Sequence, residues 1–186
     1  MNLPNTLTLV RMVLSFLMVA LLLVPGVGPK VAALVVFTAA ALTDLWDGRI
    51  ARRRGLVTSF GVLMDPIADK VLVLSAFFSF VKLHVAPVWM VALIAARELL
   101  ITGLRLVALA KGQALPAEAA GKVKAASQMV TIALALAFLV VRELRPAGSW
   151  LPPARSGLLV LMALTVLLTL TSGASFLWHN RKQIFG

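Results

Sequence analysis

The sequence contains no cysteine and only two histidines among its 186 residues. Without cysteine, the chain has no disulfide bond, no zinc–thiolate site and no thiol nucleophile. His84 and His179 lie far apart and near expected helix ends. We therefore expect neither a histidine-based metal centre nor a serine–histidine catalytic pair.

Charged residues are also scarce. They make up 13% of the chain, against 61% hydrophobic residues, whereas about a quarter of a soluble domain is charged. This composition predicts an all-α integral membrane protein. The net charge of +11 could indicate a nucleic-acid partner. We favour the other reading, because basic residues flank membrane spans and attract anionic lipid headgroups.

Six apolar runs account for nearly the whole chain. They cover residues 12–24, 31–47, 59–81, 88–110, 122–141 and 157–178. Each is close to the roughly 20 residues that cross a bilayer core, and lipid forces such spans to be helical. We predict six transmembrane helices in a single membrane domain over residues 1–186, with a short interfacial segment before the first run. No basic stretch precedes Arg11, so we expect the first span to be uncleaved.

The loops predict the orientation of these spans. Nine basic residues fall on the side that holds both termini and the 48–58 loop, and five fall on the other side. Cytoplasmic loops favour lysine and arginine. We therefore expect both termini and the 48–58 loop to face the cytoplasm.

Four of the seven acidic residues lie in one short stretch, as Asp44, Asp47, Asp65 and Asp69. The first two are spaced i, i+3 and the last two i, i+4, so each pair shares one helical face. An aspartate at the centre of a span costs about 2.5–3.5 kcal/mol on insertion. Antiparallel packing of the two neighbouring spans is expected to bring the four carboxylates together near the cytoplasmic side.

Carboxylates this close repel one another and need a cation. Oxygen ligands without cysteine or histidine suit Mg²⁺, Mn²⁺ or Ca²⁺. Gly48 and Gly61 lie on the same faces, either as small packing positions or, as we favour beside carboxylates, to let a bulky ligand approach the backbone. Arg52 indicates an anionic ligand, because arginine can bind phosphate through two parallel hydrogen bonds.

This spacing resembles a known signature at every fixed position. The pattern Asp44-x2-Asp47-Gly48-x2-Ala51-Arg52-x8-Gly61-x3-Asp65-x3-Asp69 is similar to that of the CDP-alcohol phosphatidyltransferase family. Members transfer a phosphatidyl group from CDP-diacylglycerol to an alcohol and release CMP. The family is also similar to this chain in size and in number of spans. The resemblance implies Mg²⁺ or Mn²⁺ as cofactor, with two ions, a homodimer, and a bacterial inner or plasma membrane.

The resemblance also implies roles for single residues. Asp44, Asp47 and Asp65 would bind metal, and Asp69 would lie near a second metal and act as the general base. The CDP moiety would be held by Gly48, Ala51, Arg52, Thr58 and Gly61. Two divalent cations can neutralise the pyrophosphate and the leaving CMP, and a carboxylate can take the proton of the attacking hydroxyl. Direct in-line attack is simpler here than a covalent intermediate.

The acceptor alcohol is indicated by three further stretches. "NLPNTLTLVR", "AARELLITGLR" and "GKVKAASQ" resemble a branch of the family that uses sn-glycerol 3-phosphate. We expect its phosphate to be bound by Arg97, Arg105, Lys122 and Lys124, although the two lysines could equally be ordinary flanking charges. Arg97 is deep for an unpaired charge, so it either pairs with an acid such as Glu98 or faces a polar cavity.

Other readings of the acidic cluster stay open at this point. Serine, inositol phosphate and phosphatidylglycerol are alternative acceptors within the family. A divalent-cation transporter is the alternative from another class, but transporters place such carboxylates near the midplane, often with an internal repeat. Here the carboxylates lie toward one end of the spans, and the sequence shows no repeat. An intramembrane aspartyl protease needs two mid-membrane aspartates rather than four.

Overall fold

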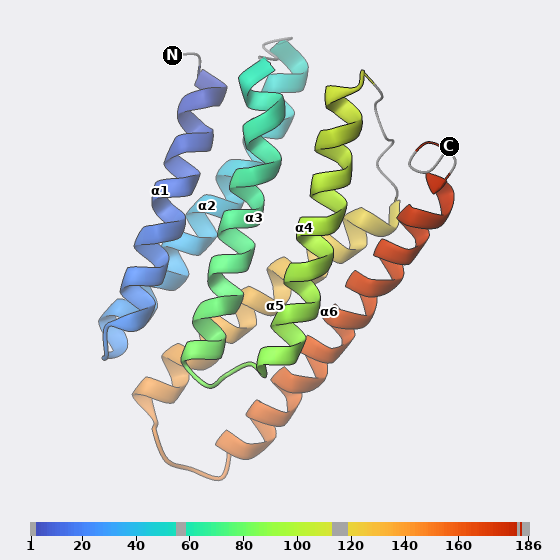
Figure 1. Cartoon of the computed structure of the whole chain (residues 1–186). Coiled ribbons are helices and arrows are strands. Elements are labelled where there is room, and N and C mark those ends of the chain that lie inside the picture. Colours follow the sequence, from blue (N-terminus) through green and yellow to red (C-terminus); the bar gives the residue numbers. More distant parts are fainter. Residues whose placement is uncertain (1–2, 55–58, 113–118, 182, 184–186) are drawn as a thin grey trace.

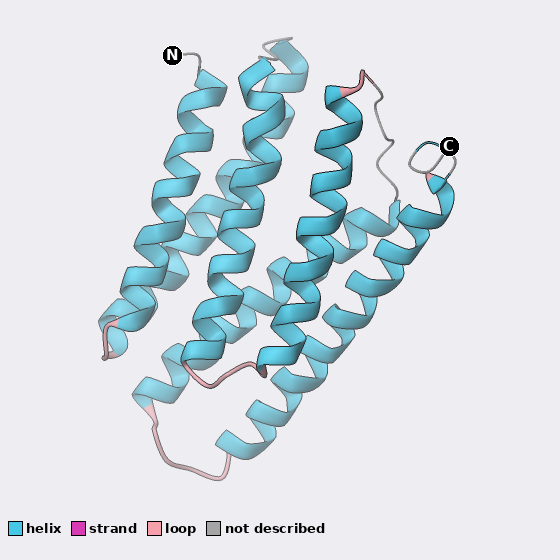
Figure 2. Cartoon of the chain, in the orientation of Figure 1, coloured by secondary structure: helices cyan, strands magenta, loops and turns pink. Residues whose placement is uncertain are grey.

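The described part of the chain consists of six α-helices, without a strand, in the computed structural model (Figures 1 and 2). The helices are α1 Leu3–Leu23, α2 Val27–Arg54, α3 Ser59–Lys82, α4 Val88–Ala110, α5 Ala119–Leu144 and α6 Leu151–His179. The structure describes residues 3–54, 59–112, 119–181 and 183. Within these ranges, the side chains of residues 3–5, 7, 44–54, 59–63, 65–66 and 119–120 lie outside the description.

The prediction of an all-α fold is confirmed, and α4 covers the residues predicted for it. Every other helix extends beyond its apolar run, and α1 and α2 do so the most. α1 begins at Leu3, so most of the expected interfacial segment belongs to the same helix as the first apolar run. α2 continues to Arg54, through residues expected to form a basic loop. Alanine and arginine are good helix formers, so the end of an apolar run does not mark the end of the helix.

The helices run up and down, and both termini lie at the same end of the bundle (Figure 1). We call this the termini end; α2 and α4 end there, and α3 and α5 begin there. The opposite end, with the turns at residues 24–26, 83–87 and 145–150, is called the far end. α1 packs against α2 and α3, α5 packs against α2, α3 and α6, and α4 packs against α3 and α6.

The bundle is apolar both inside and outside. Phe77, Phe80 and Leu136 are fully buried between the helices. Other large apolar side chains are exposed, with Phe16 at 64% and Val160 at 62% of their surface. Among the described residues, two helical segments are long and apolar enough to cross a membrane, Gly121–Leu144 and Leu151–His179. These features suggest a membrane protein, while six spans remain a prediction.

Basic side chains at the far end donate to backbone carbonyls at the ends of helices. Lys30 is buried, and its ammonium lies 2.6 Å from the carbonyl oxygen of Leu22, in the last turn of α1, and 2.7 Å from that of Val24, just past its end. Arg142 donates to the Leu83 carbonyl at 3.3 Å, just past the end of α3. These carbonyls have no intrahelical partner, and cations there also interact favourably with the helix dipole.

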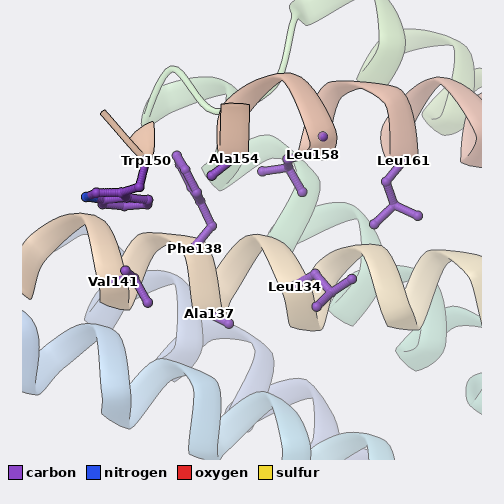
Figure 3. A pocket seen from close by; sticks show the side chains of 9 residues that line it. Leu134, Ala137, Phe138, Val141, Trp150, Ala154, Leu158 and Leu161 are labelled. Atoms are coloured by element: carbon purple, nitrogen blue, oxygen red, sulfur yellow. The ribbon is translucent and has the colours of Figure 1, made fainter. Parts of the chain in front are cut away.

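An apolar groove lies between α5 and α6 near the far end (Figure 3). Its volume is ≈ 340 Å³, and its lining includes Leu134, Phe138 and Leu161. The Trp150 ring meets the edge of Phe138 with 6.1 Å between ring centroids. No ionisable side chain lines this groove, so it offers no chemistry of its own.

Candidate active site

The acidic motif lies on two helices at the termini end. Asp44 and Asp47 belong to the C-terminal part of α2, and Asp65 and Asp69 belong to the N-terminal half of α3. Both pairs therefore keep the helical spacing from which a shared face was predicted. The side chains of Asp44, Asp47, Asp65, Gly48, Ala51, Arg52 and Gly61 lie outside the description, as does Thr58 as a whole. Their roles in binding metal and CDP stay predictions.

The donor chemistry of this motif fits a divalent cation. Four carboxylates at helical spacing supply only hard oxygen ligands, which Mg²⁺ and Mn²⁺ prefer. Among the side chains that the structure describes, no group of three histidine, aspartate or glutamate residues is placed to hold a metal. Asp44, Asp47, Asp65 and Asp69 stay the predicted metal ligands, since their oxygen donors suit these ions.

Asp69 is the member of the motif whose side chain is described, and it is paired with α1. Its Oδ1 accepts a hydrogen bond of 2.6 Å from Nη1 of Arg11. The Arg11 side chain is 3% exposed and that of Asp69 is 37% exposed. The contact orients the carboxylate while leaving part of it accessible to a ligand. Arg11 was predicted only to precede the first apolar run. A single arginine within an apolar helix is nevertheless a signal of function.

Next to Asp69, a cluster of charged side chains surrounds Glu98 of α4. The Glu98 side chain is fully buried, at 0% exposed. Its Oε2 lies 2.5 Å from the ammonium of Lys70 on α3, and its Oε1 pairs with the ammonium of Lys124 on α5. Gln128 donates to the same Oε1 at 3.2 Å. One carboxylate thus joins side chains of three helices.

Arg97 adds a third cation to this cluster. Its Nη1 lies 3.3 Å from Oε1 of Glu98 and its Nη2 donates to Oγ of Ser172 on α6 at 2.9 Å. Of the two readings of Arg97, pairing with an acid is the one that the structure shows, but Glu98 belongs to the same helix rather than to another one. A Cβ atom at Gly173 would lie 3.0 Å from Cγ and 3.2 Å from Nε of Arg97. The absence of a side chain at Gly173 therefore makes room for this arginine.

Counted over the described side chains, the cluster carries more positive than negative charge. Lys70, Arg97 and Lys124 contribute three cations, and Glu98 contributes one carboxylate. Buried charges that are not compensated are costly. An anionic ligand between these helices would supply the missing negative charge, and Lys70, at 26% exposed, is the member most open to it.

The four residues predicted to bind the acceptor phosphate are divided by the structure. Arg97 and Lys124 meet at Glu98. Arg105 lies two turns further along α4, with its guanidinium carbon 4.9 Å from the centroid of the Phe176 ring, and its buried Nε has no hydrogen-bond partner among the described residues. Lys122 is exposed, whereas Lys124 is buried, because positions i and i+2 of a helix do not share a face.

Glu98 and Lys70 did not enter the predicted site, although the sequence contains a signal for both. Glu98 is the acidic residue of a long apolar run, and Lys70 directly follows Asp69. Ionisable residues within apolar helices usually mark a function. Which of them meet depends on how the helices are rotated about their axes, and helical spacing alone does not give that rotation.

The fold and the cluster together define a class. The described residues form a helical bundle with an apolar exterior, an acidic motif on α2 and α3, and beside it a group of buried and partly buried cations suited to an anionic ligand. The chain belongs to the CDP-alcohol phosphatidyltransferase family, whose model matches residues 1–179.

Relatives within this family have similar lengths. A Bacillus subtilis protein named CDP-diacylglycerol–glycerol-3-phosphate 3-phosphatidyltransferase is 38% identical over 147 residues, covering 73% of this chain and 76% of its own. An Escherichia coli K12 protein of the same name is 39% identical over 137 residues, covering 71% and 75%. A Mycobacterium tuberculosis protein named "Probable phosphatidylglycerophosphate synthase" is 36% identical over 188 residues, covering 100% and 84%.

Proposed function

We propose that this protein is a membrane enzyme that transfers the phosphatidyl group of CDP-diacylglycerol to sn-glycerol 3-phosphate, giving phosphatidylglycerophosphate and CMP. The names of three relatives at 36–39% identity support this activity. One structural observation carries the choice of acceptor: a cluster with excess positive charge begins at Lys70, the residue that follows Asp69. A phosphate-bearing acceptor bound there would place its hydroxyl near the acidic motif.

The reaction is a single displacement at phosphorus. A hydroxyl oxygen of the acceptor forms a bond to the phosphatidyl phosphorus, and the bond from this phosphorus to the bridging oxygen of the pyrophosphate breaks. CMP leaves with the bonding electrons, and Asp69 accepts the proton of the hydroxyl as general base. Bound Mg²⁺ or Mn²⁺ would neutralise charge on the donor's phosphates. The contact with Arg11 holds the Asp69 carboxylate in one orientation during this step.

The two substrates are held by different groups. Gly48, Ala51, Arg52, Thr58 and Gly61 hold the CDP moiety, as their match to the family pattern suggests. Lys70, Arg97 and Lys124 bind the acceptor phosphate, and Arg105 contributes from the same helix as Arg97. Charge-assisted hydrogen bonds to phosphate are among the stronger ones in proteins. Lys122, which was also predicted to bind the acceptor phosphate, is exposed and is therefore a weaker candidate for this role than Lys124.

The setting of the enzyme is part of the proposal. Six spans, a cytoplasmic site with both termini on the same side, a bacterial inner or plasma membrane, and two metal ions follow from the composition, the loop charges and the family pattern. A homodimer rests on the family resemblance alone. Membership in a transferase family makes a divalent-cation transporter the weaker alternative.

The test uses the purified full chain with CDP-diacylglycerol and a panel of labelled acceptors: glycerol 3-phosphate, serine, inositol phosphate and phosphatidylglycerol. We expect CMP release and labelled lipid with glycerol 3-phosphate, complete loss of both in EDTA, and recovery on adding Mg²⁺ or Mn²⁺. Faster turnover of another acceptor would overturn the choice of acceptor, and full activity in EDTA would overturn the metal site.

A further inference from the structure

We infer that Glu98 is a positioning residue, which holds the cations of α3, α4 and α5 in the arrangement that receives the acceptor phosphate. The inference rests on the proposed function and deepens it. Glu98 does not itself bind the phosphate, since both are anionic. Its role is to keep two lysines and an arginine within reach of one point before the substrate arrives.

The contacts of Glu98 show how one side chain achieves this. Oε1 contacts Lys124, Arg97 and Gln128, and Oε2 forms an ion pair with Lys70, so each oxygen has a cationic partner. Lysine side chains are long and flexible, and fixing them reduces the entropy that a ligand must otherwise lose on binding. Without the carboxylate, the two ammonium groups would repel each other and separate.

The charge balance separates this role from that of an ordinary buried ion pair. A structural pair needs one cation for one carboxylate, as at the far end, where Lys30 lies 4.0 Å from Glu143. Among the described side chains, Glu98 instead faces three cations, and these four charges sum to plus two. A phosphomonoester carries a charge close to minus two at neutral pH. The complex with such an acceptor is therefore nearly neutral, whereas serine or another neutral acceptor would leave the excess uncompensated.

The first experiment compares Glu98→Gln with Glu143→Gln, a matched change in the other described glutamate that faces a lysine. Glu98→Gln should raise the KM for glycerol 3-phosphate by roughly tenfold or more, the order expected for one lost charge-assisted contact. It should leave the KM for CDP-diacylglycerol within about twofold. Glu143→Gln should leave both constants within about twofold. Glycerol 3-phosphate should also raise the thermal midpoint of the wild type and fail to raise that of Glu98→Gln.

The conservative variant Glu98→Asp keeps the charge but shortens the side chain by one methylene, so the carboxylate loses at least one lysine. It should give a smaller rise in acceptor KM than Glu98→Gln. This variant also answers the question if Glu98→Gln does not fold. An acceptor KM that is unchanged in Glu98→Asp, or that falls in either variant, would overturn the inference.

A purely structural role is tested by measuring the acceptor KM of Glu98→Gln and Glu98→Asp well below their thermal midpoints, where both variants are folded. If Glu98 only stabilises the fold, the thermal midpoints fall while the acceptor KM of the folded variants equals that of the wild type, which would overturn the inference. If Glu98 positions the cations, the acceptor KM stays high in the folded variants. Failure of the proposed function looks different, because the wild type itself would then release no CMP with glycerol 3-phosphate.

Discussion

The two ends of the bundle use basic residues in different ways. At the far end, Lys30 and Arg142 donate to backbone carbonyls close to helix ends, and each contact is complete without a ligand. At the termini end, Lys70 and Lys124 converge from different helices on Glu98, with more cations than the carboxylate can neutralise. Both ends contain buried cations, so burial alone does not separate a cation that stabilises the fold from one that is proposed to bind a ligand. The group that the cation contacts makes the difference.

The largest effect is expected from the acidic motif at the termini end. Asp69→Asn removes the proposed general base and should lower the turnover number by about 10²-fold or more. Binding of CDP-diacylglycerol, measured by equilibrium titration, should survive. Turnover close to that of the wild type would remove Asp69 from this role.

The next largest effect is expected at Lys124, which is compared with Lys122 in the same turn of α5. Lys124→Gln should raise the KM for glycerol 3-phosphate by roughly 10- to 150-fold, because a charge-assisted contact contributes about 1.5–3 kcal/mol. Lys122→Gln, two residues away and exposed, should change it by less than about twofold. Equal effects in steady-state kinetics would show that burial against Glu98 does not define the acceptor site.

A smaller effect is expected where α6 supports Arg97. Gly173→Ala introduces a methyl group 3.0 Å from the Arg97 Cγ and should move the guanidinium away from Glu98. The acceptor KM should rise by about three- to tenfold, or roughly 0.7–1.4 kcal/mol.

The matched control is Gly157→Ala, also on α6. Its added Cβ would meet nothing within 4 Å, so the acceptor KM should not change. A similar rise in both variants would attribute the effect to α6 as a whole rather than to Arg97.

At the far end, a change should affect stability alone. Lys30→Met keeps the apolar stem but removes the contacts with the Leu22 and Val24 carbonyls, a loss of about 1.5–3 kcal/mol. The thermal midpoint in detergent should fall by on the order of 5 °C, with both KM values unchanged. A selective rise in acceptor KM would break the distinction between the two ends.

Much of the fold and part of the site could be predicted from the sequence. The limits of α4 and the existence of all six helices follow from the apolar runs and from the proline, glycine and charged residues that separate them. Arg97 and Lys124, two of the residues predicted to bind the acceptor, meet at Glu98 in the structure, while their role in binding stays a prediction. The ends of α1 and α2 were missed because helix propensity continues beyond the apolar run.

The central position of Glu98 was not predictable in the same way. Spacing along one helix shows which residues share a face, but not which neighbouring helix that face meets. The pairing of Lys70 with Glu98, and of Arg97 with Ser172, depends on the rotation of α3, α4 and α6. For the same reason, spacing puts Lys122 and Lys124 on different faces of α5 but does not tell which of these faces is buried.

The positions of these contacts along the chain have a consequence for biosynthesis. Lys30 contacts the carbonyls of Leu22 and Val24, all within the first 30 residues. The carbonyls at the end of α1 can therefore gain this partner as soon as the start of α2 has been synthesised. The Glu98 cluster instead requires α3, α4 and α5, and Ser172 arrives last with α6. Because chains fold from the N-terminus as they are synthesised, the acidic motif is complete before the cation cluster. A nascent chain that ends after α4 would hold Glu98 with Lys70 and Arg97 but without Lys124.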